Sequence, residues 1–398
     1  MVEIGITDGS GGQPTARLRV LDGLRFLAAV SVAIFHLVAV AGRGPGTVRT
    51  MDIWGEPPQH VFGWFWVLAC FGWIGVNLFF LISGFVICMS SWGRTAGRFA
   101  VSRIVRLFPA YWAAIGLTTA CVLIFPAVFR RLPWKDILLN LTMQQQSFGV
   151  ASVDAVYWTL VVELKFYLLF MIVVWLGLNY RKAVGFCLLW TVASAIALEA
   201  KVPLLLNAIL VPTVSHYFVA GVAMFLIYRF GPNLILYAIV GYSWIVAMHY
   251  DFNLWPLTVG LPTWPAMVLI TASFAVMLLL ALHKLEWLRW RGLTVLGATT
   301  YPLYLLHYTI GTTLVFLLVR NLDLPPYVTL GIALTLLVLL SWMVHRLVER
   351  PLAPILKRHL ERAMTAARRH TPAAVPAGPP VAIRKQQLPV AGSHEDRA

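Results

Sequence analysis

The sequence contains few charged residues for its length. Of 398 residues only 12% are Asp, Glu, Lys or Arg, whereas 60% are hydrophobic. Soluble globular domains carry about 25% charged residues, so this composition excludes a soluble domain and indicates a polytopic membrane protein. Acidic residues are scarcer still, with 16 against 31 Lys and Arg. In so apolar a chain this excess reports orientation in the membrane and anionic ligands rather than binding to nucleic acid.

Cysteine is also scarce. The four cysteines, Cys70, Cys88, Cys121 and Cys187, show no CxxC spacing and have no histidine at ligand distance in the sequence. Metal sites and disulfide frameworks need clustered or regularly spaced cysteines. We therefore expect neither a metal site nor a disulfide framework.

What the sequence does contain is a series of apolar runs near the length of about 20 residues that crosses a bilayer. They predict an all-α membrane protein, a polytopic bundle of about ten transmembrane helices. The expected spans are approximately 20–40, 71–90, 108–127, 157–177, 183–199, 206–228, 233–249, 262–282, 300–319 and 327–346. Pro203 and Pro212 interrupt the pattern of the fifth and sixth spans. The first run could also be a signal peptide, but it is too long and Arg25 interrupts it.

Basic residues set the expected orientation. The loops after even-numbered spans, together with the C-terminal stretch, carry more Lys and Arg than the loops after odd-numbered spans. The positive-inside rule then places both termini in the cytoplasm. We expect a disordered lead over residues 1–16, a transmembrane domain over 17–352 and a basic cytoplasmic tail over 353–398. From about residue 371 the tail is rich in Pro and Ala without periodicity, which indicates disorder.

The first apolar run carries Arg25 and His36, two ionisable residues that are costly to hold in hydrocarbon. Their spacing places both side chains on one face of the helix, about 16 Å apart along its axis. Counted at about 1.5 Å per residue, Glu163 on the fourth span lies at the depth of His36. A carboxylate that orients an imidazole makes a general base, so we expect this pair to be catalytic. The alternative is a structural pair that pins the first span to the fourth.

Arg103 and Arg106 stand three residues apart on one helix face, which we expect to end at Pro109. Two guanidinium groups this close repel each other unless an anion such as phosphate lies between them. Positive charge that contacts lipid headgroups at a helix end explains the spacing equally well.

Four further polar residues are candidates for lining a site: Asn77, Ser83, Tyr304 and His307. Asn77 lies at the expected depth of His36 and could donate to an oxyanion. For Ser83, close helix packing is the simpler explanation. His307 falls near the depth of Arg25, and a hydrogen bond within the bundle explains it equally well.

Taken together, the motifs resemble those of the acyltransferase type 3 family of bacterial integral-membrane O-acyltransferases. The resemblance rests on Arg-x10-His in the first span, FFLISGF, RxxR, WTLVVELKFY, YPLYLLH and the closing VERP, in this order over about residues 18–352. It implies transfer of an acyl group, commonly acetyl from acetyl-CoA, to a hydroxyl of a carbohydrate or glycosylated product. It also implies a location in the bacterial inner membrane.

The resemblance assigns roles residue by residue. His36 and Glu163 would be catalytic, with His36 as general base, whereas Arg25, Arg103 and Arg106 would bind the phosphates of acyl-CoA, with no metal ion. The acceptor could be a polysaccharide, a lipid-linked oligosaccharide, a Nod-factor-like lipid or a macrolide antibiotic. A transporter or exporter of such compounds, with the buried charges as a proton relay, is an alternative, and a structural membrane subunit is another.

Overall fold

The computed structural model describes residues 18–43, 47, 52–200, 203–250, 260–288 and 290–370. Within these ranges the chain forms helices and no strand, so the predicted all-α fold is confirmed there. The expected disordered lead, and the tail from residue 371, lie outside the described residues.

The long helices lie close to the predicted spans. They are α1 (Arg19–Ile34) with its π-helical continuation η1 (Phe35–Val40), α4 (Ile74–Ser91), α5 (Ala96–Ile124), α7 (Trp158–Trp175), α8 (Tyr180–Glu199), α10 (Pro212–Phe230), α11 (Leu234–Tyr250), α13 (Trp264–Ala281), α14 (Gly292–Leu306), α15 (Thr309–Asn321) and α16 (Pro326–Val344). Short helices connect them: α2 (Pro58–Phe62), α3 (Trp64–Ala69), α6 (Trp134–Asn140), η2 (Gln145–Phe148), η3 (Ala155–Tyr157) and α9 (Leu204–Leu210). The π-helical η5 (His345–Glu349) and α17 (Arg350–His370) follow α16.

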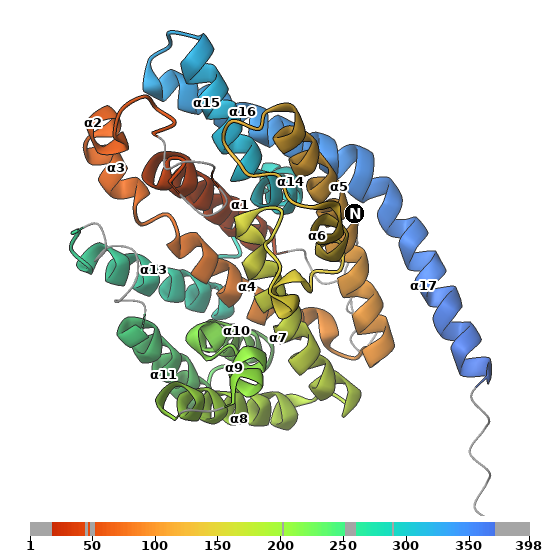
Figure 1. Ribbon diagram of the computed structural model, residues 1–398. Coiled ribbons are helices and arrows are strands. Elements are labelled where there is room, and N and C mark those ends of the chain that lie inside the picture. Colours follow the sequence, from red (N-terminus) through yellow and green to blue (C-terminus); the bar gives the residue numbers. More distant parts are fainter. Residues whose placement is uncertain are drawn as a thin grey trace, which may run out of the picture.

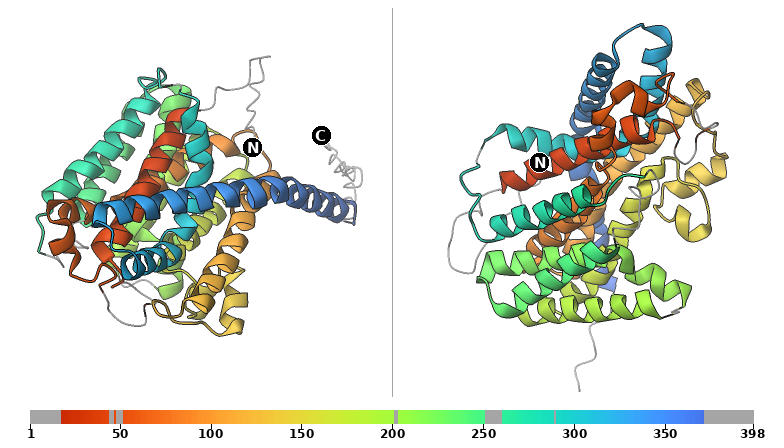
Figure 2. Two further views of the ribbon diagram at one scale, coloured as in Figure 1. Left: turned by 90° about the horizontal axis from the view of Figure 1, so that it is seen from above. Right: turned by 90° about the vertical axis from the view of Figure 1, so that its left-hand side faces the viewer.

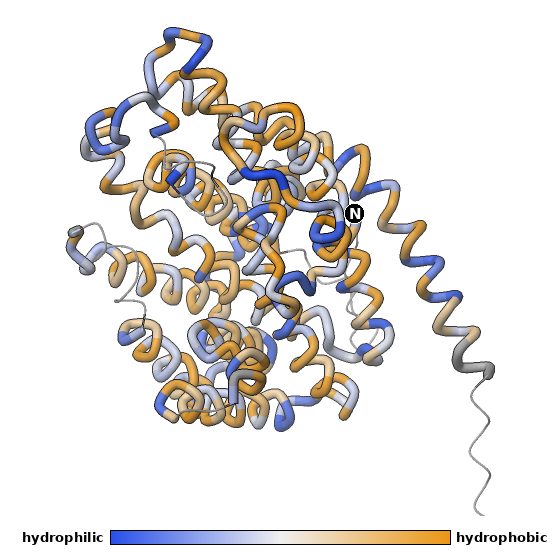
Figure 3. The backbone as a smooth tube through the Cα atoms, in the orientation of Figure 1, coloured by the Kyte–Doolittle hydropathy of each residue, from blue (hydrophilic) through white to orange (hydrophobic). Residues whose placement is uncertain are grey.

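Eight helical stretches among the described residues are long and apolar enough to cross a membrane. The helices α14 and α15 pass the same test as a pair bent by 78°, and α11 is apolar but shorter. These helical regions overlap the expected spans. The number of helices that cross a bilayer stays a prediction. Figure 3 shows apolar residues along the helices of the bundle, whereas polar residues gather on α17 and in several connections.

The helices form one bundle in which α4 lies between two groups (Figure 1). On one side α8, α10 and α11 pack together, and on the other α1 packs against α4 and α14. The C-terminal helix α17 packs against α5 and then extends away from the bundle (Figure 2).

One predicted span is wrong in shape. Residues 300–319 were expected to form one straight helix, but the chain bends sharply between Leu306 and Thr309. Membrane proteins tolerate a broken helix only where neighbouring groups satisfy the freed backbone. This break therefore points to specific contacts around it.

A second predicted boundary is wrong as well. Pro109 does not end a helix but lies inside α5, which begins at Ala96. The Thr95 side chain accepts a hydrogen bond from the backbone N–H of Arg98 and so caps the start of α5. Proline is tolerated in membrane helices because neighbouring groups replace the missing hydrogen bond.

The closest packing in the bundle joins α4 to α10. A methyl group added at Gly84 would overlap the carbonyl oxygen of Phe218, and one added at Gly221 would overlap that of Leu81. Only glycine lets the two backbones approach this closely. The packing role expected for this part of α4 is therefore confirmed at Gly84.

We predict that Gly221→Ala destabilises the protein by about 1 to 3 kcal/mol or more, because overpacking here strikes backbone rather than a movable side chain. Gly241→Ala on α11 is the control, since nothing lies within 4 Å of its added methyl group. Thermal unfolding in detergent, followed with a thiol-reactive dye, should show a clear fall in Tm for Gly221→Ala alone. Equal melting temperatures for the two variants would contradict the packing.

Candidate functional site

His36 lies where the first span changes from α-helix to π-helix. The backbone N–H of Ala41 bonds to the carbonyl of His36, five residues back, over 3.0 Å. Such π-helical turns occur frequently at functional sites. The His36 ring donates from Nδ1 to the carbonyl oxygen of Val32, 3.0 Å away.

His307 approaches the same ring nitrogen from the break between α14 and α15. Its Nδ1 donates to the carbonyl oxygen of Tyr304 at 2.8 Å, which leaves Nε2 as the lone-pair nitrogen of a neutral ring. That Nε2 lies 3.1 Å from Nδ1 of His36. The proton on His36 Nδ1 is thus shared between the Val32 carbonyl and His307, which is itself completely buried.

These two contacts define the tautomer of His36, because a hydrogen bond at one ring nitrogen decides the state of the other. With the proton on Nδ1, Nε2 carries the lone pair. None of the described residues donates to Nε2 of His36. The His36 residue is partly exposed, whereas His216, whose two ring nitrogens lack a partner, is buried. A lone pair fixed in direction beside accessible space suits a general base.

Aromatic rings surround the two imidazoles. Phe35 and Tyr308 stand edge-on to His36, each with ring centroids 5.0 Å away. Phe129 stands 5.4 Å from Tyr308 and extends this wall. The wall lowers the local dielectric constant and thereby strengthens the hydrogen bonds that orient His36.

Asp154 holds the chain immediately after the break. Its carboxylate accepts hydrogen bonds from the backbone N–H groups of Thr309, at 3.0 Å, and of Val156, at 3.1 Å, and so caps both α15 and η3. Burial raises the pKa of this carboxyl to about 6, although the hydrogen bonds from Thr309 and Val156 oppose the rise. Sequence analysis missed Asp154, yet an aspartate just before an expected helix is a typical capping signal.

Glu163 does not contact His36, so the expected contact between these two side chains is wrong. Its carboxylate accepts hydrogen bonds from Ser83 at 2.8 Å and from Tyr167 at 2.5 Å. No hydrogen bond or ion pair within the described ranges joins it to His36. His307, expected near the depth of Arg25, contacts His36 instead.

The error arises from the depth assigned to the start of α7. The hydroxyl of Thr159, on the first turn of α7, lies 2.8 Å from that of Tyr304, one turn before His307. The first turn of α7 is therefore already level with His36, and Glu163 lies about 6 Å further along the helix axis. A residue count from an assumed membrane boundary cannot reveal that the preceding segment bends into the bundle.

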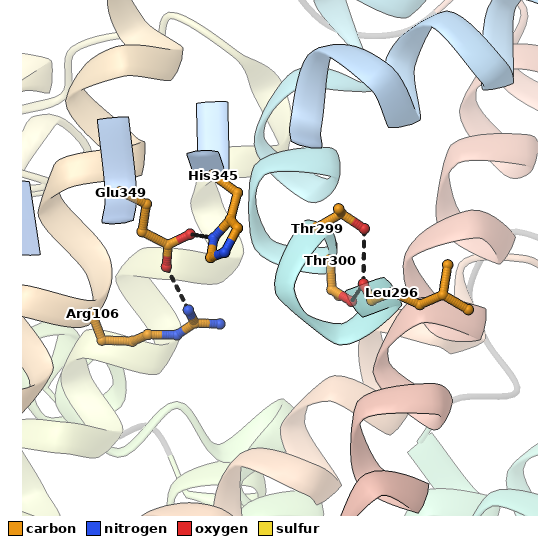
Figure 4. Close-up of polar contacts among 6 residues, drawn as sticks. All are labelled: Arg106, Leu296, Thr299, Thr300, His345 and Glu349. Atoms are coloured by element: carbon orange, nitrogen blue, oxygen red, sulfur yellow. Dashed lines mark hydrogen bonds and ion pairs between the residues drawn. The ribbon is translucent and has the colours of Figure 1, made fainter. Parts of the chain in front are cut away.

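A second polar cluster joins α5 to η5. Arg106 donates from Nη1 to Glu349 at 2.5 Å, and His345 donates from Nδ1 to the second oxygen of the same carboxylate at 2.8 Å (Figure 4). The guanidinium also lies over the ring of Tyr301, 5.5 Å from its centroid. The Glu349 carboxylate thus ties α5, through Arg106, to the end of η5.

The other two arginines belong to the same region. The guanidinium of Arg103 lies 5.7 Å from the ring centroid of Tyr167, which interacts electrostatically with Glu163 and Arg25. Arg25 also interacts with Arg106. We call the set of Arg25, Arg103, Arg106, Glu163 and Glu349 the arginine cluster. The structure brings the three predicted arginines together. Carboxylates of the chain itself supply part of the negative charge that we expected between them.

The remaining candidate residues, Ser83, Tyr304 and Asn77, lie in different parts of the bundle. Ser83 binds Glu163 in the arginine cluster, whereas the ring of Tyr304 lies 5.5 Å from that of His307, centroid to centroid, and its hydroxyl contacts Thr159. The amide of Asn77 donates to the hydroxyl of Tyr217 on α10 at 2.9 Å. In the part of the chain that the structure describes, no group of three or more His, Cys, Asp or Glu is arranged to hold a metal ion.

Comparison with known proteins gives one match. A family model described as an acyltransferase domain matches residues 18–345, most of the chain. No curated protein and no solved structure matches. The matched range includes α1, the break between α14 and α15, and the arginines of the second cluster.

We predict that Asp154→Ala lowers the stability by about 1 to 3 kcal/mol, because two buried backbone N–H groups lose their acceptor. Asp323→Ala, at an exposed position, serves as the control. The Tm in detergent should fall for Asp154→Ala and stay unchanged for Asp323→Ala. If both variants melt like the parent protein, Asp154 does not hold the break in place.

Proposed function

The chain belongs to the acyltransferase family whose domain model covers residues 18–345, and on this premise we propose that it is a membrane O-acyltransferase. We propose that it moves an acetyl group from acetyl-CoA to a hydroxyl of a carbohydrate or glycosylated acceptor. The observation that carries the proposal is the oriented lone pair on Nε2 of His36, a partly exposed residue.

His36 would act as the general base. Its Nε2 takes the proton of the acceptor hydroxyl while the oxygen attacks the thioester carbonyl, and a tetrahedral intermediate forms. Collapse of the intermediate breaks the carbon–sulfur bond. The departing CoA thiolate takes the proton back from His36, so the base is regenerated and atoms and charges balance.

His307 would be a positioning residue in this scheme. It holds the Nδ1 side of His36 and can share the positive charge that develops on the protonated ring. This role replaces the one expected for Glu163, whose carboxylate lies in the arginine cluster.

The arginine cluster would bind the phosphates of the donor. An arginine offers five N–H donors, and the structure gives Arg106 one hydrogen bond to Glu349, while 42% of its side-chain surface stays exposed. Arg25 and His36 are about 16 Å apart along α1, so an acyl-CoA held at the cluster would extend its pantetheine arm toward His36. With both termini in the cytoplasm of a bacterial inner membrane, the donor would enter from the cytoplasm.

We predict that His36→Ala abolishes acetyl transfer but leaves acetyl-CoA binding within about twofold, because the base is lost and the arginine cluster is untouched. Mass spectrometry of surface glycans and secreted metabolites, with and without the gene, identifies the acetylated acceptor. Purified protein with labelled acetyl-CoA then gives the rate.

His60→Ala is the control, since His60 is exposed at α2. Undiminished transfer by His36→Ala would end the proposal. Transport of the acceptor that depends on the proton gradient, and needs no acyl-CoA, would favour an exporter instead.

We predict that Arg103→Ala raises the KM for acetyl-CoA about tenfold with little change in kcat, because a lost phosphate contact weakens ground-state binding. Arg103 is a better probe than Arg106, whose removal would leave Glu349 buried without its cation. Arg98→Ala, also on α5 but exposed, removes the same charge as a control. An equal KM for the two variants would show that Arg103 does not bind the donor.

A further inference from the structure

A cavity of about 190 Å³ lies between α8, α10 and α11. We call it the α10 pocket. Its polar lining includes Ser194 and Glu199 from α8, His216 from α10, and Ser243 and Tyr250 from α11. Figure 1 shows these three helices together, on the other side of α4 from α1. The pocket is thus separate from His36 and from the arginine cluster.

Three side chains in this lining are buried and lack a hydrogen-bond partner. They are Ser194, His216 and Ser243, with exposed fractions of 4%, 5% and 1%. Both ring nitrogens of His216 and both serine hydroxyls are unsatisfied. Buried polar groups in folded proteins are almost always paired, so four such atoms around one cavity point to an occupant.

The chemistry of these atoms limits what the occupant can be. A neutral imidazole donates from one nitrogen and accepts at the other, and a serine hydroxyl does both. An ammonium group can only donate, so it cannot satisfy both nitrogens of His216, and an anion such as phosphate needs cationic partners. The described residues that line the pocket include no Lys or Arg to hold an anion. A compound with several hydroxyl groups meets every requirement.

The size and shape of the α10 pocket limit the class of ligand further. At about 30 Å³ per liquid water molecule, the cavity has room for about six waters, or for one small ring compound, but not for an oligomer. Tyr242 and Tyr250 line the pocket and add flat apolar faces against which the carbon skeleton of such a ring can pack. The one carboxylate, Glu199, already accepts a hydrogen bond from the Tyr250 hydroxyl at 3.1 Å.

We propose that the α10 pocket binds one uncharged polyhydroxyl compound of the size of a single sugar ring. The hydroxyl groups of this ligand satisfy His216, Ser194 and Ser243. This binding does not depend on acyl transfer, because the lining contains none of the residues assigned to that reaction.

The test uses the whole chain in detergent and the probes methyl glucoside, myo-inositol, methylamine and inorganic phosphate. Binding is measured by saturation-transfer NMR and by the shift in Tm. A glucosyl diacylglycerol distinguishes a lipid headgroup from a free polyol. We expect saturable binding of at least one uncharged polyol or of the glycolipid, and none of methylamine or phosphate.

Ser243→Val and His216→Leu should each weaken that binding at least tenfold. Ser273→Val, which removes an exposed hydroxyl on α13, should leave it unchanged. Ser243→Val keeps the test decisive if His216→Leu fails to fold. Equal binding by Ser243→Val, preference for a charged probe, or a pocket that holds only water and binds no polyol would each overturn the proposal.

Discussion

The contact between His307 and His36 is the interaction on which the rest of the site depends. His307 lies at the C-terminal end of α14, directly before the break that leads into α15, and its Nε2 lies 3.1 Å from His36 Nδ1. Asp154 caps the start of α15, and the π-helical turn of η1 carries His36 itself. A break and a π-helical turn, two departures from regular helix geometry, therefore converge on one imidazole.

The first span links this imidazole to a very different environment at its other end. Around Arg25 the chain gathers three guanidinium groups and offsets them with its own carboxylates, Glu163 and Glu349. This compensation offsets the cost of holding the cations in an apolar bundle. A donor phosphate would compete with or join these carboxylates, while its thioester approaches His36. In the proposed reaction, the separation of the two polar regions along the first span would match the two ends of a long co-substrate.

The positions of helices and of side chains along one helix could be predicted from the sequence. Contacts that depend on where the chain bends could not. Apolar length predicted the helices, and the spacing of Arg25 and His36 follows from helix geometry alone. The partner of His36 could not be predicted, because residue counts place a side chain at a depth only if the span is straight and starts at the boundary. Both assumptions failed: the first at the break before Thr309, the second at α7, which begins inside the bundle. Asp154 was predictable in principle, as a capping residue, but its bond to Thr309 joins segments 155 residues apart.

The most direct measurement of the central claim is the protonation state of His36 in protein labelled with 15N-histidine. Its signals are identified by their loss in His36→Gln. The account predicts a neutral ring at pH 7, with a protonated Nδ1 that shows coupling to His307 and an unprotonated Nε2. A ring protonated on Nε2, or one without any contact to His307, would contradict it.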